Sequence, residues 1–176
     1  MSRPRIAARL ALMPVLAALL AACVALPPHA VAAQPEAKPF VAGADAMGEV
    51  DAALARAAAS GKRVLMVMGG NWCHDSRALA GWLATPRFAA LVAANYDLVF
   101  VDVGMPQVGE GRNLAVAQRF GLNELAGTPA LLVITPDGQA INADTAISWR
   151  DAAYRSEDAI FTELTALAKA PLPPAL

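Results

Sequence analysis

One cysteine occupies a position where its sulfur could act as a nucleophile. Residues 69–77, GGNWCHDSR, follow the apolar run 64–68 and precede a stretch with helical spacing, so Cys73 falls at the start of a helix. Unpaired backbone N–H groups and the helix dipole stabilise a thiolate there, and the thiolate is the form that attacks disulfides. We expect Cys73 to be exposed and reactive. The competing interpretation is an inert, buried thiol.

The neighbours of this cysteine bear on the same chemistry, and each also has a plainer interpretation. His74, as a cation, would favour the thiolate, or it is a solvent-exposed loop residue. The Ser76 hydroxyl could donate a hydrogen bond to the thiolate, or it is an ordinary polar residue of the first helical turn. Trp72 is either a platform for substrate or part of the core. We expect Asp75 to accept hydrogen bonds at the start of its helix and Arg77 to be solvated.

The sequence does not favour a metal site, and we expect neither a metal nor a cofactor. Cys73 and His74 could supply two ligands, with Met66 or Met68 as a third. Methionines inside an apolar strand are far more often core residues than ligands. The other histidine, His29, is distant in the sequence.

The scaffold around the nucleophile contains several segments with helical character. Each combines apolar residues at helical spacing with a start or stop signal, such as Asp45 before the first segment and Ser156 before the last. The expected helices cover about 46–60, 73–83 and 113–120, with a further helical turn that opens at Thr85-Pro86 and a final helix after Ser156.

Between the helices lie short, continuously apolar runs of the kind that form strands buried on both faces. These runs are 64–68, 98–103 and 130–134. The sequence TPDGQ at 135–139 has the residues of a tight turn, so a short antiparallel strand is expected at 140–142. Alternating strands and helices that end in a hairpin predict an α/β sandwich with a mixed sheet.

Three motifs together resemble the thioredoxin superfamily. Trp72-Cys73 between a strand and a helix resembles its active-site turn, and residues 127–129, GTP, before an apolar strand resemble its cis-proline segment. The sequence Pro-Asp-Gly at 136–138 resembles the following hairpin, and the likeness covers roughly residues 45–170. The resemblance implies a thioredoxin-like sandwich, a mixed central β-sheet flanked by helices, over residues 43–176. It also implies that the Thr128–Pro129 bond is cis, that Pro129 packs beside Cys73, and that the Thr128 backbone offers an edge for a substrate peptide.

Two departures from the family pattern restrict the chemistry. Ser76 stands where the second cysteine of a Cys-x-x-Cys pair would fall, and Val67 stands where many thioredoxins bury a carboxylate. A hydroxyl cannot form a disulfide, so only one-thiol chemistry remains. Cys73 would attack a disulfide, hold a mixed disulfide, and be released by an outside thiol.

The resulting functional hypothesis is monothiol thiol–disulfide exchange, either isomerase-like or ending in a mixed disulfide. Its catalytic residues would be Cys73, Ser76 and His74. Its substrate-binding residues would be Trp72, Thr128 and Pro129. The expected substrates are exported proteins or low-molecular-weight thiols. The alternative is a non-catalytic module that binds peptides in the groove beside the cis-proline, with the cysteine incidental.

The first residues of the chain have the features of an export signal. Arg3, Arg5 and Arg9 precede the uncharged apolar run 10–22, which is too short to span a membrane. Residues 20–23, LAAC, resemble a bacterial lipobox. The resemblance implies a signal peptide over 1–22, a lipid on Cys23 and a proline-rich tether over 23–42. The alternatives are cleavage after 31–33, which gives a soluble periplasmic protein, and an uncleaved anchor.

Composition and charge agree with an exported, single-domain protein. The chain has 176 residues, enough for one domain, and its 57% hydrophobic content excludes a disordered polymer. Without the three leading arginines, eleven basic residues face fifteen acidic ones, a formal net charge of −4. Such a charge gives no reason to expect nucleic acid as a partner. Val24, where inner-membrane retention usually shows Asp, favours anchoring in the outer membrane.

We predict that the mature protein begins at a lipidated Cys23, because the lipobox-like residues directly follow the apolar run. Mass spectrometry of the N-terminal peptide from a membrane fraction measures this, with Cys23→Ser as the control that should lose the lipid. An unmodified N-terminus at Gln34, recovered from the soluble periplasm, would contradict the prediction.

Overall fold

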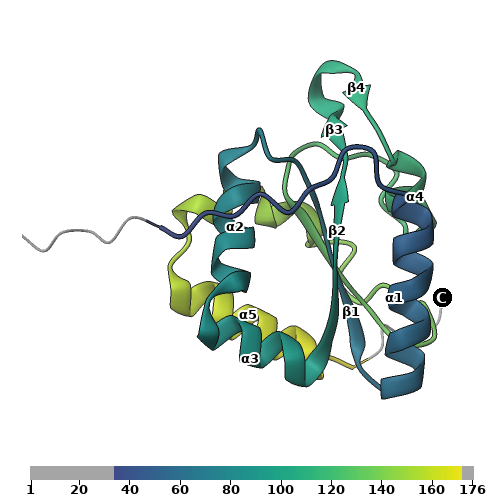
Figure 1. Cartoon of the computed structure of the whole chain (residues 1–176), viewed down its shortest axis with the longest axis vertical. Coiled ribbons are helices and arrows are strands. Elements are labelled where there is room, and N and C mark those ends of the chain that lie inside the picture. Colours follow the sequence, from purple (N-terminus) through teal and green to yellow (C-terminus); the bar gives the residue numbers. More distant parts are fainter. Residues whose placement is uncertain (1–33, 172–176) are drawn as a thin grey trace, which may run out of the picture. The chain divides into compact units, whose positions relative to one another are not determined.

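Three strands form the central sheet of residues 34–171, the part of the chain that the computed structural model describes (Figure 1). β1 (Arg63–Gly69) lies in the middle, parallel to β2 (Tyr96–Asp102) and antiparallel to β5 (Ala130–Ile134). The mixed sheet expected from the apolar runs is confirmed. The proposed signal peptide, Cys23 and most of the proposed tether lie outside the described residues. Within those residues, no helix is both long enough and apolar enough to cross a membrane.

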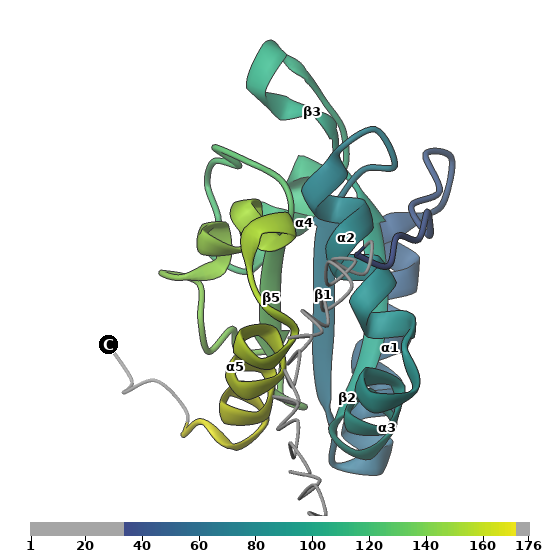
Figure 2. The same cartoon turned by 90° about the vertical axis from the view of Figure 1, so that its left-hand side faces the viewer.

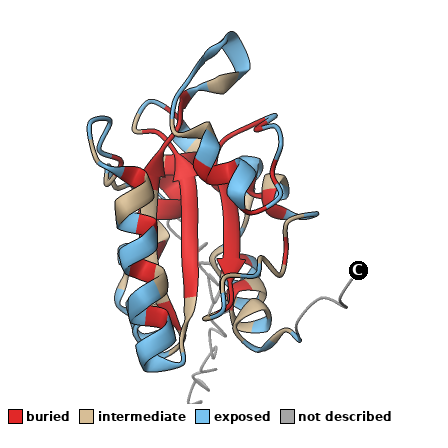
Figure 3. Ribbon diagram, turned by 90° about the vertical axis from the view of Figure 1, so that its right-hand side faces the viewer, coloured by how far each residue is buried: buried red, intermediate tan, exposed pale blue. Residues whose placement is uncertain are grey.

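The two faces of the sheet pack against different sets of helices. Val64, Met66 and Met68 of β1 face one core cluster, which includes α1 (Ala46–Ser60) and α4 (Leu114–Arg119). Leu65 and Val67 face the other, which includes α2 (His74–Ala84), α3 (Pro86–Asn95) and α5 (Glu157–Lys169). Because successive side chains of a strand point to opposite faces of the sheet, β1 contributes to both cores. The strands are buried, and the outer faces of the helices are exposed (Figure 3). The α/β sandwich is confirmed.

The helix boundaries follow the capping residues of the sequence. The Asp45 side chain accepts a hydrogen bond from the Gly48 N–H at 3.0 Å, and α1 ends at Gly61 with a φ of 71°. Ser156 caps α5 in the same way as Asp45 caps α1, through the Ala159 N–H. Helix α2 begins at His74, and Cys73 is its N-cap residue in an extended conformation.

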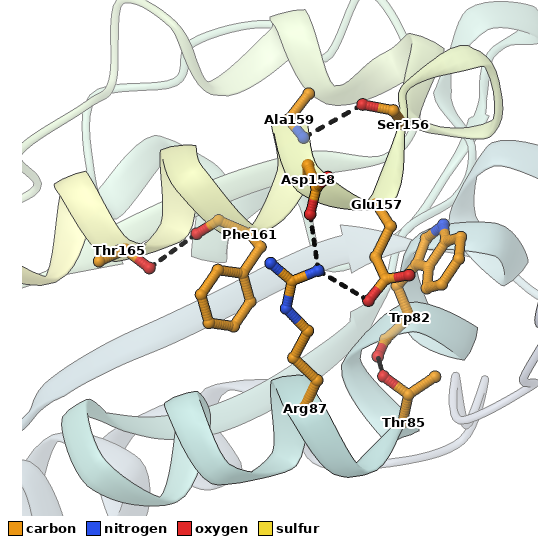
Figure 4. A network of polar contacts seen from close by, with 9 residues as sticks. All are labelled: Trp82, Thr85, Arg87, Ser156, Glu157, Asp158, Ala159, Phe161 and Thr165. Atoms are coloured by element: carbon orange, nitrogen blue, oxygen red, sulfur yellow. Dashed lines mark hydrogen bonds and ion pairs between the residues drawn. The ribbon is translucent and has the colours of Figure 1, made fainter.

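After Pro86 the chain forms a complete helix, where the sequence predicted only a helical turn. α3 packs against α5 through Arg87, whose guanidinium donates to Glu157 at 2.9 Å and to Asp158 at 2.7 Å (Figure 4). The same guanidinium lies 4.1 Å from the centre of the Phe161 ring. Contacts with a distant helix therefore stabilise a segment whose own sequence signal is short.

The strand expected at 140–142 is replaced by a single backbone bridge and a side-chain contact. Ala140 makes one antiparallel bridge with Ile134. The Asn142 side chain then accepts from the Val133 N–H at 2.8 Å and donates to the Leu131 carbonyl at 3.0 Å. Because the Asn142 amide satisfies the backbone of β5, the chain can turn away without a further strand.

Two parts of the fold were absent from the sequence prediction. Residues 104–111 form a small projecting arm of β3 (Gly104–Met105), η1 (Pro106–Val108) and β4 (Glu110–Gly111) (Figures 1 and 2). The 3₁₀ segment η2 (Ala146–Tyr154) follows Asn142. Trp149 of η2 is fully buried, which fixes the segment against the second core cluster.

Residues 36–41, which the sequence assigned to the tether, form an N-terminal strap on the domain. The Ala37 N–H donates to the Arg77 carbonyl at 3.0 Å. The Phe40 side chain is buried, and its ring meets the Phe100 ring edge-on at a centroid distance of 5.3 Å. The expected tether boundary at 42 therefore needs correction, because one apolar side chain and several backbone contacts attach the strap to the domain.

We predict that Phe40→Ala lowers the free energy of unfolding by about 3–5 kcal/mol, since it removes a buried aromatic side chain. The adjacent Val41 is 63% exposed, so Val41→Ala is a matched control with a change within about 0.5 kcal/mol. Urea unfolding of both variants measures the difference. Equal stabilities would show that the strap does not contribute to the fold.

Candidate active site

The pairing of β1 with β5 brings two loops together at one end of the sheet. Met68 pairs with Ala130, so the residues that follow β1 lie beside those that precede β5. The Cys73 thiol donates a hydrogen bond to the Thr128 carbonyl, with 3.3 Å between sulfur and oxygen. The Thr128–Pro129 peptide bond is cis. The structure thus places Cys73 and the Thr128–Pro129 segment side by side, as the sequence motifs predicted.

The expectation that Cys73 is exposed is wrong for this structure. The residue is 8% exposed, because its turn packs it against the Thr128 segment. The backbone around it is well held: its N–H donates to the Gly70 carbonyl at 3.0 Å, and its own carbonyl accepts from the Arg77 N–H at 3.1 Å. The sulfur is therefore fixed at the N-terminus of α2, where the helix dipole favours an anion.

Ser76 lies one helical turn after Cys73, but its hydroxyl makes no hydrogen bond with the thiol. The side chain is fully buried, and its oxygen has no hydrogen-bond partner among the described residues. It packs onto the α-carbon of Gly69 so closely that a β-carbon added to that glycine would lie 2.5 Å from the Ser76 oxygen. The Thr128 hydroxyl is likewise buried without a partner in that part of the chain. The predicted contact from Ser76 to sulfur is not formed in the thiol state.

His74 and Arg77 both face Glu36 of the N-terminal strap. His74 Nε2 lies 3.3 Å from Glu36 Oε1, and Arg77 Nε lies 3.0 Å from Glu36 Oε2. The Arg77 guanidinium also donates to the carbonyls of Asn71, at 3.1 Å, and Trp72, at 3.0 Å. The hydrogen bond from Arg77, with help from the charges of Arg77 and His74, holds the pKa of Glu36 below its usual range.

The expectation that Arg77 is solvated therefore needs correction. Its side chain is only 20% exposed, because it connects the strap to the two residues that precede Cys73. His74, by contrast, keeps 58% of its side chain exposed, as its plainer interpretation predicted. The Asn71 amide adds a second connection, donating to the Phe40 carbonyl at 2.7 Å and accepting from the Phe40 N–H at 3.2 Å.

Two further contacts tie the active-site turn to elements absent from the prediction. The indole N–H of Trp72, a residue that is 48% exposed, donates to the Gly104 carbonyl of the arm at 2.9 Å. We expected Asp75 to accept hydrogen bonds at the start of its own helix, and this expectation is wrong. The Asp75 carboxylate accepts from the Ala153 N–H of η2 at 2.9 Å. Trp72, which directly precedes Cys73, thus has a partly exposed side chain whose indole is held by the arm.

Comparison with known proteins agrees with this geometry. The profile of a family described as thioredoxin-like matches residues 45–136, which include Cys73 and Pro129. The chain belongs to the thioredoxin-like family. It is also similar to the crystal structure of a disulphide isomerase from Xylella fastidiosa Temecula1, with 31% sequence identity and a TM-score of 0.69. The likeness covers 76% of this chain and 98% of that one. No curated protein matches the sequence.

The thioredoxin-like site also contains residues that the sequence did not reveal. Glu36, which pairs with Arg77, was assigned to the tether. Asn71 was given no role, because its partner Phe40 lies 31 residues away in the sequence and no local pattern indicates the contact. A cavity of about 320 Å³ lies between the arm, α4 and residues 122–126, and neither Cys73 nor Thr128 lines it. Among residues 34–171, no three His, Cys, Asp or Glu side chains are grouped so that they could hold a metal ion.

The buried Ser76 hydroxyl generates a prediction about stability. Ser76→Ala should leave the free energy of unfolding unchanged or raise it by about 1 kcal/mol, because a buried, unpaired hydroxyl is removed. Ser156→Ala is the matched control. It removes a capping hydroxyl, so it should cost about 1 kcal/mol. Thermal or urea unfolding compares the two variants. If Ser76→Ala lowers the free energy of unfolding as much as Ser156→Ala does, the Ser76 hydroxyl is not an unpaired group.

Proposed function

We propose that this thioredoxin-like protein carries out thiol–disulfide exchange through a single thiol, that of Cys73. The observation that carries the proposal is the contact of the Cys73 sulfur, at the N-terminus of α2, with the carbonyl that precedes the cis-proline. The similarity to a disulphide isomerase supports the same class of reaction. Ser76 in place of a second cysteine makes the chemistry monothiol.

The exchange proceeds in two displacements that leave the number of disulfides unchanged. The Cys73 thiolate attacks one sulfur of a substrate disulfide, the S–S bond breaks, and one substrate sulfur leaves as a thiolate. Ser76 cannot displace the resulting mixed disulfide. A second thiolate, from the same substrate or from a low-molecular-weight thiol, then attacks the substrate sulfur and releases Cys73.

The proton of the thiol must leave without the buried strand carboxylate that many thioredoxins have. Val67, at the position of the family's carboxylate, is fully buried and pairs with Phe100 and Leu131 in the sheet. The thiol proton points to the Thr128 carbonyl, which cannot take it. Solvent, or the departing substrate thiolate, therefore accepts the proton. His74 is close in sequence and partly exposed, so it is suited to stabilise the anion but not to act from within the core.

The proposal extends to the partners and the location of the protein. The substrates would be exported proteins or low-molecular-weight thiols, with substrate backbone lying along Thr128 and Pro129 and beside the exposed face of Trp72. The protein would reside in the cell envelope, anchored to the outer membrane through a lipid on Cys23, with a soluble periplasmic form as the alternative. The location and the exported substrates are proposed from the sequence features of residues 1–42, and the position of the substrate from the resemblance of residues 127–129 to the family's cis-proline segment.

The burial of Cys73 favours a second candidate, a peptide-binding module without catalysis. The residue is 8% exposed and its thiol proton is engaged by Thr128, which is the arrangement of an inert thiol. Alkylation of Cys73 by iodoacetamide at neutral pH separates the two candidates. If Cys73 is catalytic, iodoacetamide should modify it in the folded protein. If the protein only binds peptides, iodoacetamide should modify Cys73 only after unfolding.

We predict that Ser76→Cys gains a reversible disulfide with Cys73, because the second thiol sits one helical turn away as in two-cysteine relatives. Wild type should show little insulin reduction, and Ser76→Cys should show measurable but weak turnover, since Val67 supplies no proton acceptor. Ser148→Cys, on the exposed surface of η2, is the matched control and should gain no turnover.

Peptide mapping under non-reducing conditions identifies the bond in Ser76→Cys, and Cys73→Ala should abolish every thiol-dependent signal. Dithiol turnover by the wild type would contradict the monothiol mechanism. Failure of Ser76→Cys to form the internal disulfide in an oxidising buffer would contradict the proposed geometry of the site.

A further inference from the structure

One arginine near the active site differs from all the others in residues 34–171. Seven of the eight arginines there contact a carboxylate or a backbone carbonyl, whereas Arg150 makes no such contact within that range. The partnered residues are Arg56, Arg63, Arg77, Arg87, Arg112, Arg119 and Arg155. Arg150 is exposed. Its guanidinium is therefore available to an incoming anion.

The backbone of Arg150 is held in a fixed place by its neighbours in η2. Trp149 is fully buried in the second core cluster. Ala153, three residues further on, donates its N–H to Asp75 of α2 at 2.9 Å. The segment that carries Arg150 is thus attached to the same helix that begins after Cys73.

The stem of Arg150 lies directly on the backbone that precedes the cis-proline. A β-carbon placed on Gly127 would lie 2.9 Å from Cδ of Arg150 and 3.1 Å from its Cβ. Gly127 is followed by Thr128, whose carbonyl is 3.3 Å from the Cys73 sulfur. The Arg150 side chain therefore contacts Gly127, and the next residue, Thr128, carries the carbonyl that accepts from the Cys73 thiol.

Three other cations at this end of the domain are paired with carboxylates, while Lys38 of the strap lies near Glu36 without an ion pair among the described residues. His74 and Arg77 share Glu36, and Arg112 lies 3.3 Å from Asp102. Acidic residues on the neighbouring segments are Asp151 and Glu124, which form no ion pair with Arg150, and Asp75, whose carboxylate accepts from the Ala153 N–H. Arg150 is thus an arginine without an ion pair among the described residues, and its side chain contacts Gly127, the residue before Thr128.

We propose that Arg150 binds a carboxylate of the molecule that reacts with Cys73, and so makes the site selective for thiols and disulfides that carry a carboxylate near the sulfur. A guanidinium suits this role because its planar N–H groups match the two oxygens of a carboxylate. The carboxylate could belong to a low-molecular-weight thiol or to an acidic residue beside a substrate cysteine. The effect of Arg150 on disulfide exchange rests on the proposed function. Its effect on how fast Cys73 reacts with anionic rather than neutral reagents does not.

The test compares alkylation of Cys73 by iodoacetate, an anion, with alkylation by neutral iodoacetamide. In both reactions the sulfur attacks the CH₂ carbon and iodide leaves, so the reagents differ mainly in charge. Mass spectrometry of the Cys73 peptide from the full chain gives the two rates without interference from Cys23. The variants are Arg150→Gln, Arg150→Glu and Arg150→Lys. Lys62→Gln, before β1 at the opposite end of the sheet, is the control for net charge.

The ratio of the iodoacetate rate to the iodoacetamide rate should fall roughly two- to fivefold in Arg150→Gln, the range for one exposed charge. It should fall further in Arg150→Glu, return toward wild type in Arg150→Lys and stay unchanged in Lys62→Gln. An unchanged ratio in both Arg150→Gln and Arg150→Glu would overturn the proposal. So would an equal change in both rates, since that indicates a structural role.

A second arm identifies the source of the carboxylate and separates this proposal from the proposed function. Mixed-disulfide formation at Cys73 is compared for glutathione disulfide and for peptide disulfides with Asp or Asn beside the cysteine. Loss of the preference for glutathione disulfide in Arg150→Gln indicates a small thiol, and loss of the Asp preference indicates a protein substrate. Either outcome supports the role of Arg150. If no mixed disulfide forms with any reagent, the proposed function fails while the alkylation ratio still decides the role of Arg150.

Discussion

The pairing of β1 with β5 is the constraint on which the site depends. Because Met68 lies opposite Ala130 in an antiparallel register, the turn that leaves β1 and the segment that enters β5 meet at the same end of the sheet. A shift of one residue would exchange the two core faces of β5, and every residue of that strand is buried. The contact between Cys73 and Thr128 is thus a consequence of how the two apolar cores are filled.

Given that register, the turn itself is held from three directions. Asn71 connects it to the strap, Trp72 to the arm, and Asp75 to η2. A nucleophile whose backbone is fixed on all sides loses little conformational entropy when it meets its substrate, which favours reaction. The same rigidity limits access, and Cys73 is correspondingly buried. Under the proposed function, a substrate strand would replace the contact of the thiol with Thr128, so that substrate binding and release of the thiol would be linked.

Local signals predicted the parts of the molecule that local physics determines. The apolar runs predicted the strands, Asp45 and Ser156 predicted two helix starts, and the motifs around Cys73 and Pro129 predicted their juxtaposition. The arm is a local hairpin without a long apolar run, so its short strands gave no strand signal. The strap and η2 make hydrogen bonds to residues far apart in the sequence, which no local pattern encodes. The solvated surface role expected for Arg77 and the exposure expected for Cys73 were wrong for the same reason. The role of Arg77 was inferred from its residue type and the exposure of Cys73 from its position and neighbours, without knowledge of what packs against either residue.

The central claim is that Cys73 forms and releases mixed disulfides as a single thiol, and one mass measurement tests it most directly. The folded protein is incubated with excess glutathione disulfide, its mass is determined without reductant, and the Cys73 peptide is mapped. We expect one glutathione on Cys73 in the folded protein, removed completely by reduced glutathione. Modification of Cys73 only after unfolding in urea would contradict it, because the thiol would then be a buried structural residue.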